Sequence, residues 1–319
     1  MTNGRAVVAL DIGGTKISAG LISRAGETLW QRAEATGQIS LADSLDQITR
    51  LIQEAASAAP SGCDVVGVGL AVPGWVNRRA GTVWAPNIAG WDHIPLEREL
   101  RQRAPWPLIV DSDRNAYVTG EAWRGAAAGL EDVIFVAVGT GIGAGIISGG
   151  RLIRGHNDLA GCAGWFALQP DFQELYAQIG CFEAEASGKS LGRKAEERGF
   201  FAGRETELAH GARAVITAAE LGDAAARALL DEAARFLGMG VANLISALNP
   251  EMVALGGGLL QQGEYLLAAT RRECQRWAQP MAVKRARIER SALGEHAGLY
   301  GAARIAWDET ISGASATEQ

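Results

Sequence analysis

The chain has 319 residues, a length that corresponds to about two domains. Its 30 Lys and Arg residues against 36 Asp and Glu residues give a formal net charge of −6. This acidic balance argues against nonspecific nucleic-acid binding, which needs a basic surface, and we expect no nucleic-acid partner. Hydrophobic residues make up 48% and charged residues 21%, a globular composition that excludes wholesale disorder.

The four cysteines lie far apart and form no Cys-x-x-Cys pair, which fits a reducing compartment better than a disulfide framework. The first residues lack the long apolar run and small-residue cleavage site of a secretion signal. The uncharged stretch 133–150 contains six glycines, which indicates two strands and a tight turn and not a membrane span. We therefore expect a cytoplasmic protein with no membrane partner.

The first half of the chain alternates apolar runs with helical periods, as is typical of an α/β domain. In chain order, the expected elements are strands at 6–11, 17–23 and 28–33, a helix at 41–59, a strand at 65–72, a helix at 94–103, a strand at 107–110 and a helix at 113–128. Short turns join the first three strands, which predicts an antiparallel meander.

The second half opens with a repeat of the first. Residues 14–23 (GTKISAGLIS) and 139–148 (GTGIGAGIIS) are identical at seven of ten positions, which indicates an internal duplication. The expected elements are strands at 133–138 and 144–148, helices at 189–197, 212–220 and 223–248, a strand at 251–255, a helix at 263–277, a strand at 286–289, a helix at 295–307 and a frayed tail after Thr310. Two halves joined without a long linker predict two domains around a cleft.

Three glycine-rich turns follow apolar strands. They are Gly13-Gly14-Thr15-Lys16, Gly139-Thr140-Gly141 and Gly256-Gly257-Gly258. Glycine lets backbone N–H groups approach phosphate oxygens, Thr adds a hydroxyl donor and Lys adds positive charge. The third turn precedes the helix expected at 263–277, and a helix N-terminus favours anions. The three turns together predict a nucleotide-binding protein.

Two other nucleotide motifs fail. Residues 188–190 (GKS) look like the end of a P-loop, but Glu183 stands where that motif needs a glycine. Residues 139–144 (GTGIGA) match the loose dinucleotide pattern, yet strand-like residues follow them where the pattern needs a helix. A dehydrogenase is therefore not expected.

Two aspartates stand at strand ends. Asp11 ends the first strand beside the first glycine turn, and Asp113 follows the strand at 107–110. Carboxylates in such places suit two tasks, holding Mg²⁺ directly or through water and taking the proton from an attacking hydroxyl. Asp113 is also a candidate helix N-cap, and the residue pattern alone leaves both interpretations open.

Taken in order, the motifs resemble the ROK family (repressor, open reading frame, kinase) of sugar kinases and sugar-responsive regulators. The matching segments are DIGGTK at 11–16, VPGWV at 72–76, APNIAGW at 85–91, the block at 113–115, VGTGIGAGI at 138–146, GCFEAEASG at 180–188, NPEMVALGGG at 249–258 and GLYGAA at 298–303. The resemblance covers nearly the whole chain. It implies the actin-like ATPase fold of sugar kinases, with two duplicated α/β domains around an interdomain cleft.

The resemblance also implies how the domains divide the work. The smaller domain would be residues 1–116 plus 296–310 and would carry the first phosphate loop and sugar-binding segments. The larger domain, 117–295, would carry the second phosphate loop and the adenosine side. By the same resemblance, Asp113 is the general base and Asp11 lies near Mg²⁺, through water.

The implied contacts extend to the turns and to a set of sugar-binding positions. Phosphate contacts are implied for Gly13, Gly14, Thr15, Lys16, Gly139, Thr140 and Gly141, and adenosine-side contacts for Gly256, Gly257 and Gly258. Substrate contacts are expected at Gly74, Asn87, Ser112, Asp113, Trp165 and Glu183, where Ser112 replaces the usual Asn of the family.

The chain departs from the family pattern at 160–165 (AGCAGW). Cys162 stands where the family has a sugar-binding Glu, and Trp165 stands where it has a zinc-binding His. Glu174 and Tyr176 occupy two expected cysteine positions, so that Cys181 alone remains of four zinc ligands. One thiol cannot form a tetrahedral structural site, so we expect no zinc.

We expect the ordering role of zinc to pass to packing around Trp165, Phe166, Phe172 and Tyr176. Trp165 would either stack on the C–H face of a sugar or fill the gap that zinc leaves, and we favour the gap.

The function implied is an ATP- and Mg²⁺-dependent kinase that phosphorylates a hydroxyl, most often the 6-hydroxyl in the family, of a hexose or hexose derivative. It would resemble a glucokinase or an N-acyl-hexosamine kinase and act as a homodimer. The alternatives are a catalytically inactive sugar-binding sensor of the same family and a cyclitol or amino-sugar kinase. A DNA-binding repressor is not expected, because the first expected strand begins at Ala6 and leaves no room for a helix-turn-helix.

Overall fold

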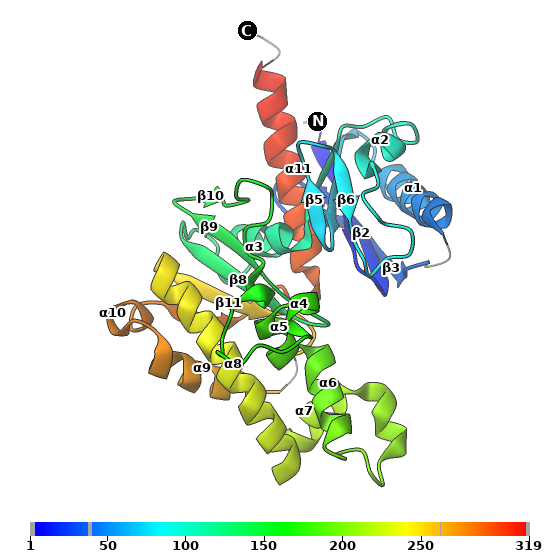
Figure 1. Cartoon of the computed structure of the whole chain (residues 1–319). Helices are drawn as coiled ribbons and strands as arrows, with labels where there is room; N and C mark the ends of the chain where they lie inside the picture. The colour runs from blue at the N-terminus through cyan, green and yellow to red at the C-terminus, as the bar shows by residue number, and fades with distance from the viewer. Residues whose placement is uncertain (1–3, 38–39, 262, 317–319) are drawn as a thin grey trace. The chain divides into compact units, whose positions relative to one another are not determined.

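The computed structural model describes residues 4–37, 40–261 and 263–316 (Figure 1). The chain divides into two compact units. Unit 1 contains the residues up to Ala128, the segment Arg154–Ala160 and the residues from His296 onward. Unit 2 contains Gly129–Ile153 and Gly161–Glu295.

Unit 1 is built on a mixed sheet that has five strands in the described residues. They are β1 (Gly4–Ile12), β2 (Lys16–Ser23), β3 (Thr28–Ala35), β4 (Cys63–Val72) and β7 (Leu108–Ser112), in the spatial order β3-β2-β1-β4-β7. The first three form the antiparallel meander that the sequence predicts, and β4 and β7 extend the sheet in parallel. A small antiparallel hairpin of β5 (Trp75–Asn77) and β6 (Thr82–Trp84) follows β4.

The helices of unit 1 are α1 (Leu41–Ser57), α2 (Leu96–Arg101), α3 (Asp113–Arg124) and α11 (Ala297–Ala316). Helix α1 begins after Ser40, whose hydroxyl accepts a backbone N–H, and it buries one apolar face against the core. Helices α3 and α11 pack closely, because a Cβ on Gly120 would lie 2.2 Å from the carbonyl oxygen of Ala297. The frayed tail expected after Thr310 is wrong for residues 311–316, because α11 continues to Ala316 (Figure 1), and the rest of that tail lies outside the described residues.

Unit 2 repeats the sheet of unit 1. In the described residues its strands are β8 (Val133–Val138), β9 (Ile142–Ser148), β10 (Arg151–Leu152), β11 (Met252–Gly256) and β12 (Arg287–Arg290), in the order β10-β9-β8-β11-β12. The first three strands are again antiparallel and the last two parallel. The same order and directions in both units, together with the sequence repeat at the two first hairpins, confirm the expected duplicated α/β fold.

The helices of unit 2 are α4 (Tyr176–Ile179), α5 (Cys181–Ala186), α6 (Gly188–Glu197), α7 (Ala212–Glu220), α8 (Ala224–Leu248), α9 (Tyr265–Trp277) and α10 (Pro280–Val283), with 3₁₀ turns at Ala163–Trp165 and Glu205–His210. Helix α8 begins after Asp223, whose carboxylate accepts the N–H of Ala226 at 2.9 Å. It packs against α5 and α9 and supplies much of the core. Within the described ranges, no helix has both the length and the apolar composition needed to cross a membrane.

Candidate active site

Unit 1 brings Asp11 and Asp113 close to each other. Asp11 lies near the end of β1, and Asp113 opens α3 directly after β7, while β1 and β7 both pair with β4. The carboxylate of Asp113 accepts the N–H of Arg114 at 2.7 Å and the hydroxyl of Tyr117. The N-cap interpretation of Asp113 is wrong, because the Ser112 hydroxyl caps α3 by accepting an N–H of the first turn. The carboxylate of Asp113 is thereby left for other chemistry.

Burial changes the acidity of both carboxyl groups. Burial, and after it the charge of Asp113, raises the pKa of Asp11 to about 7, although Lys16 opposes the change. Burial raises the pKa of Asp113 to about 6 against the opposing effects of Arg114 and Tyr117. Burial and the two carboxylates also raise the pKa of Tyr117 well above its usual value, so its hydroxyl stays protonated and donates. A carboxyl group with a pKa near 6 is suited to proton transfer at neutral pH.

The first glycine turn closes the β1–β2 hairpin next to Asp11. The N–H of Gly13 donates to the carbonyl oxygen of Lys16 at 2.8 Å. A Cβ on Gly14 would lie 3.1 Å from the carbonyl oxygen of Asn87, so the turn and the 85–91 segment are in contact. Asn87 is exposed. The structure therefore brings two of the expected site segments together.

Gly74 and Ser112 have structural roles of their own. Gly74 has a φ of +84°, and a Cβ there would lie 2.2 Å from the carbonyl oxygen of Trp84, so only glycine fits the turn after β4. Ser112 is 2% exposed and its hydroxyl is engaged in the helix cap. The expected sugar contact of Gly74 stays a prediction, whereas the burial of Ser112 leaves its hydroxyl poorly placed for a direct one.

The second and third glycine turns lie next to each other in unit 2. The N–H of Gly139 donates to the carbonyl oxygen of Gly141 at 2.9 Å and closes the β8–β9 hairpin. Gly257 has a φ of +89°, and a Cβ on it would lie 2.5 Å from the carbonyl oxygen of Val138. That same oxygen accepts the N–H of Leu259 at 3.0 Å. Two of the three expected nucleotide turns thus meet at the ends of the paired strands β8 and β11.

The helix expected at 263–277, after the third turn, is confirmed as α9, which begins at Tyr265. A second helix, α6, begins at the second turn, where the N–H of Gly188 donates to the carbonyl oxygen of Gly139 at 2.8 Å. The exposed Lys189 follows. The sequence signal for this helix start was the stretch at 188–190, which resembles the end of a P-loop although it is not one.

Glu183 lies on α5, against the second turn. Its Oε2 atom accepts the N–H of Ile142 at 2.8 Å, and a Cβ on Gly141 would lie 2.5 Å from the same oxygen. Burial raises the pKa of Glu183, while the Ile142 N–H and the charge of Lys189 oppose the rise. Glu183 is therefore held as a hydrogen-bond acceptor beside the second glycine turn, one of the turns expected to bind phosphate.

The expectation that Trp165 fills a gap is wrong. Its side chain is 57% exposed, and its backbone makes the close contact, since a Cβ on Gly180 would lie 2.7 Å from the Cα atom of Trp165. The expected aromatic packing is found in part: Phe172, although 70% exposed, meets the buried ring of Tyr176 edge to face, and Phe166 stacks on Phe182, which was not in the expected set. The other interpretation of Trp165, stacking on a sugar, stays a prediction.

The expectations for metals concern Asp11, near which Mg²⁺ is expected, and Cys181, the single remaining candidate ligand for zinc. Among the residues that the structure describes, no group of three or more His, Cys, Asp or Glu could hold a metal ion. The buried Cys181 accepts the N–H of Leu168 through Sγ at 3.5 Å. The expected absence of zinc stays a prediction. Mg²⁺ is usually held by one or two carboxylates together with water and substrate phosphates, a donor set that Asp11 fits.

Comparison with known proteins supplies the class. A model described as the ROK family matches residues 7–309. The chain is 33% identical over 312 residues to a glucokinase of Halalkalibacterium halodurans, and this alignment covers 92% of each protein. The crystal structure of a ROK hexokinase from Thermus thermophilus has a TM-score of 0.80 and 32% identity, and covers 96% of this chain and 99% of that one.

A ROK family glucokinase from Streptomyces griseus, solved in complex with glucose and AMPPNP, has a TM-score of 0.79 and 34% identity, and covers 95% of this chain and 99% of that one. The duplicated fold, the glycine turns and these likenesses define a glucokinase-like sugar kinase, so the expected phosphotransferase class is confirmed. The chain belongs to the ROK family.

Proposed function

We propose that the protein transfers the γ-phosphate of ATP to the 6-hydroxyl of a hexose, with Asp113 as the general base. The observation that carries the proposal is the environment of Asp113: a buried carboxylate beside Asp11, next to the end of the strand that leads into the first glycine turn. Its pKa of about 6 leaves it ionised at neutral pH, yet basic enough to accept a hydroxyl proton.

The reaction follows from these groups. Asp113 takes the proton of the sugar hydroxyl while the hydroxyl oxygen forms a bond to the γ-phosphorus. The bond from that phosphorus to the β–γ bridging oxygen breaks, which releases ADP. Asp11 would hold Mg²⁺, through water, and the ion supplies neutralisation of phosphate charge. Gly13, Gly14, Thr15 and Lys16 offer N–H, hydroxyl and ammonium donors for phosphate oxygens.

The turns of unit 2 would hold the nucleotide. Of the adjacent turns at Gly139, Thr140 and Gly141 and at Gly256, Gly257 and Gly258, the first and the last glycine have open space where a Cβ would lie, and α6 adds a helix N-terminus at Gly139. The S. griseus relative was solved with AMPPNP, which supports ATP as the donor here. Positioning of donor and acceptor, together with stabilisation of the charge in the transition state, supplies most of the rate enhancement in such reactions.

For the sugar, we propose contacts from Gly74, Asn87, Glu183 and Trp165, and we leave Ser112 out because its hydroxyl is buried in a helix cap. Glucose is the first candidate, since the S. griseus relative was solved with glucose and the H. halodurans relative is a glucokinase. A homodimer and a cytoplasmic location remain predictions, and light scattering in solution tests the first.

A coupled ADP-release assay tests the proposal. ATP and Mg²⁺ are supplied with glucose, other hexoses, N-acyl amino sugars, amino sugars or cyclitols, and wild type is compared with Asp113→Ala and with Asp64→Ala, a change at an exposed aspartate. We expect glucose-dependent ADP release that is lost only in Asp113→Ala. Absence of turnover with every compound, together with a sugar-induced rise in Tm, would instead establish a sensor without kinase activity.

A further inference from the structure

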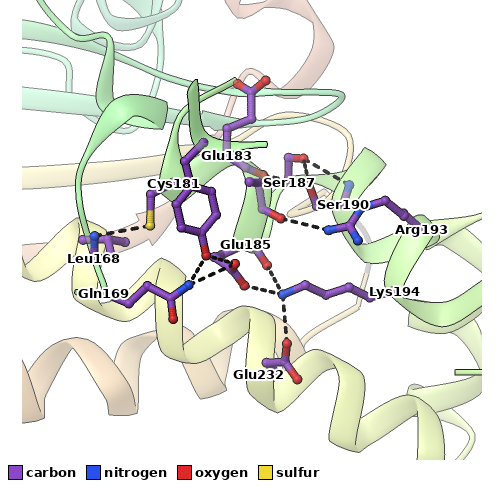
Figure 2. A network of polar contacts seen from close by, with 12 residues as sticks. Leu168, Gln169, Cys181, Glu183, Glu185, Ser187, Ser190, Arg193, Lys194 and Glu232 are labelled. Atoms are coloured by element: carbon purple, nitrogen blue, oxygen red, sulfur yellow. Dashed lines mark hydrogen bonds and ion pairs between the residues drawn. The ribbon is translucent and has the colours of Figure 1, made fainter. Parts of the chain in front are cut away.

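A buried polar network lies on the side of α5 that faces away from Glu183 (Figure 2). Residues two apart on a helix are separated by about 200° around its axis, so Glu183 and Glu185 point in opposite directions, as Figure 2 shows. Glu185 is only 7% exposed. A carboxylate buried to this degree needs partners inside the protein.

Side chains from three other segments satisfy both oxygens of Glu185. The hydroxyl of Tyr176, on α4, donates to Oε1, and the amide of Gln169 reaches the same oxygen at 3.4 Å. The ammonium group of Lys194, on α6, pairs with Oε2 at 2.5 Å and donates to the backbone carbonyl of Glu185 at 3.1 Å. Burial and Glu185 raise the pKa of Tyr176 above its usual value, which keeps its hydroxyl a donor.

The network continues to α8 and balances its charge. Lys194 also pairs with Glu232 at 2.8 Å, and Arg198 pairs with the other oxygen of Glu232 at 2.6 Å. Two carboxylates and two cations are thus linked. Figure 2 shows the part of this chain that Lys194 forms between Glu185 and Glu232. Lys194 is largely buried and Arg198 half exposed, so Lys194 is the cation that the buried Glu185 depends on.

Helix α5 needs such anchoring. It has six residues, and helices this short are not stable on their own in water. On its other side, α5 is held where Glu183 accepts the N–H of Ile142 and where the Ser190 hydroxyl donates to the Glu183 carbonyl at 2.9 Å. A shift or rotation of α5 would therefore move the Glu183 carboxylate away from Ile142.

We propose that the network of Tyr176, Glu185 and Lys194 positions Glu183 for sugar binding. The inference rests on the proposed sugar contact of Glu183. Neither Tyr176 nor Lys194 has a hydrogen bond to the Glu183 side chain among the contacts that the structure describes, so both are positioning residues that act through α5. Their loss weakens binding of the sugar more than binding of ATP, because the backbone of the second turn is not part of the network.

The test compares Lys194→Met, Lys194→Arg and Tyr176→Phe with wild type and with Arg276→Met, which removes a cation from an exposed ion pair on α9. We expect Lys194→Met to raise the KM for glucose about tenfold and Tyr176→Phe about threefold, each with kcat and the KM for ATP changed less than about twofold. Lys194→Arg retains the cation and keeps the KM for glucose near the wild-type value, while Arg276→Met leaves this KM unchanged. Tyr176→Phe keeps the buried ring and decides the question if Lys194→Met does not fold.

A second readout does not depend on activity. Hydrogen exchange at the Ile142 amide, followed by NMR, reports on the hydrogen bond to Glu183. We expect Lys194→Met to increase the exchange rate of this amide at least tenfold, while the exchange rate of the Phe135 amide in the same sheet is unchanged. Folded variants with a lower Tm but with unchanged KM for glucose and unchanged Ile142 exchange would overturn the inference. If wild type phosphorylates no sugar, the proposed function fails, and the Ile142 exchange alone then decides whether the network positions Glu183.

Discussion

Replacement of Asp113 by Asn separates the energetic effect of its carboxylate from its catalytic effect. Asn retains the shape of the side chain and an oxygen that accepts the N–H of Arg114, now made at 2.7 Å. It cannot ionise and cannot act as a base. We therefore expect Asp113→Asn to lower kcat by about 10² to 10⁴-fold, the usual contribution of a general base, while it stabilises the folded protein at neutral pH.

The size of the stabilisation follows from the acidity of the group. Burial raises the pKa of Asp113 from 3.8 to about 6. At about 1.4 kcal/mol for each pH unit, ionising this carboxyl in the folded protein costs about 3 kcal/mol more than in the unfolded chain. Because the folded protein binds the proton more tightly, the contribution of Asp113 to stability is complete below pH 3.8 and is lost as the pH rises through about 6.

Thermal unfolding of wild type and Asp113→Asn between pH 4 and 8 measures the effect. We expect similar Tm values at the acidic end and a higher Tm for the variant, by several degrees, above pH 7. Asp132→Asn is the control of opposite sign, because hydrogen bonds from Ser148 and Gly149 lower the pKa of Asp132, so its replacement should destabilise at neutral pH. An Asp113→Asn protein less stable than wild type at pH 7.5, or one that retains more than a tenth of kcat, would refute the reasoning.

Further expectations concern pH, the sugar site and the nucleotide turns. The wild-type kcat/KM should fall as the pH drops through about 6, because protonated Asp113 cannot accept a proton, and a flat profile down to pH 5 would contradict this role. Glu183→Gln, which removes the charge, should raise the KM for glucose about tenfold at saturating ATP. Gly257→Ala should lower Tm and raise the KM for ATP, whereas Gly258→Ala, with open space at its Cβ, should leave Tm unchanged, so that a rise in its KM for ATP reports contact with the nucleotide alone. Trp165→Ala should change the free energy of unfolding by less than about 0.5 kcal/mol, because the ring is exposed, and an unchanged KM for glucose would remove Trp165 from the sugar site.

The features that depend on neighbours in the sequence could be predicted. The two repeated hairpins consist of adjacent strands joined by short turns, and their registers pair Ile12 with Ile17 and Val138 with Ile142. Local hydrophobic patterns also indicated the long helices, including α8, because a buried apolar face has a period that can be counted. The duplication also implies that the two sheets share one strand order, whereas the order itself comes from the structure.

Contacts between distant residues could not be predicted in this way. Residues 154–160 belong to unit 1 because Arg154 pairs with the buried Asp111 at 2.7 Å and because Asp158 accepts the N–H of Arg78 at 3.0 Å. Lys194 likewise looks like an ordinary surface charge on an amphipathic helix until α5 and α8 are placed beside it. Nothing in the local pattern distinguishes a buried ion pair of this kind from a solvated one.

The altered segment at 160–165 shows how backbone and side chains can change independently. A Cβ on Gly161 would lie 1.7 Å from the carbonyl oxygen of Ala144, and one on Gly164 would lie 2.8 Å from that of Ile142, so glycines hold this backbone tightly against β9. The residues that differ from the family pattern, Cys162 and Trp165, alter only the side chains that this fixed backbone carries. Asp113 and the three glycine turns lie in other segments of the chain, so we expect the two substitutions to affect the KM for the sugar more than kcat, and the kinetics of Trp165→Ala test this expectation.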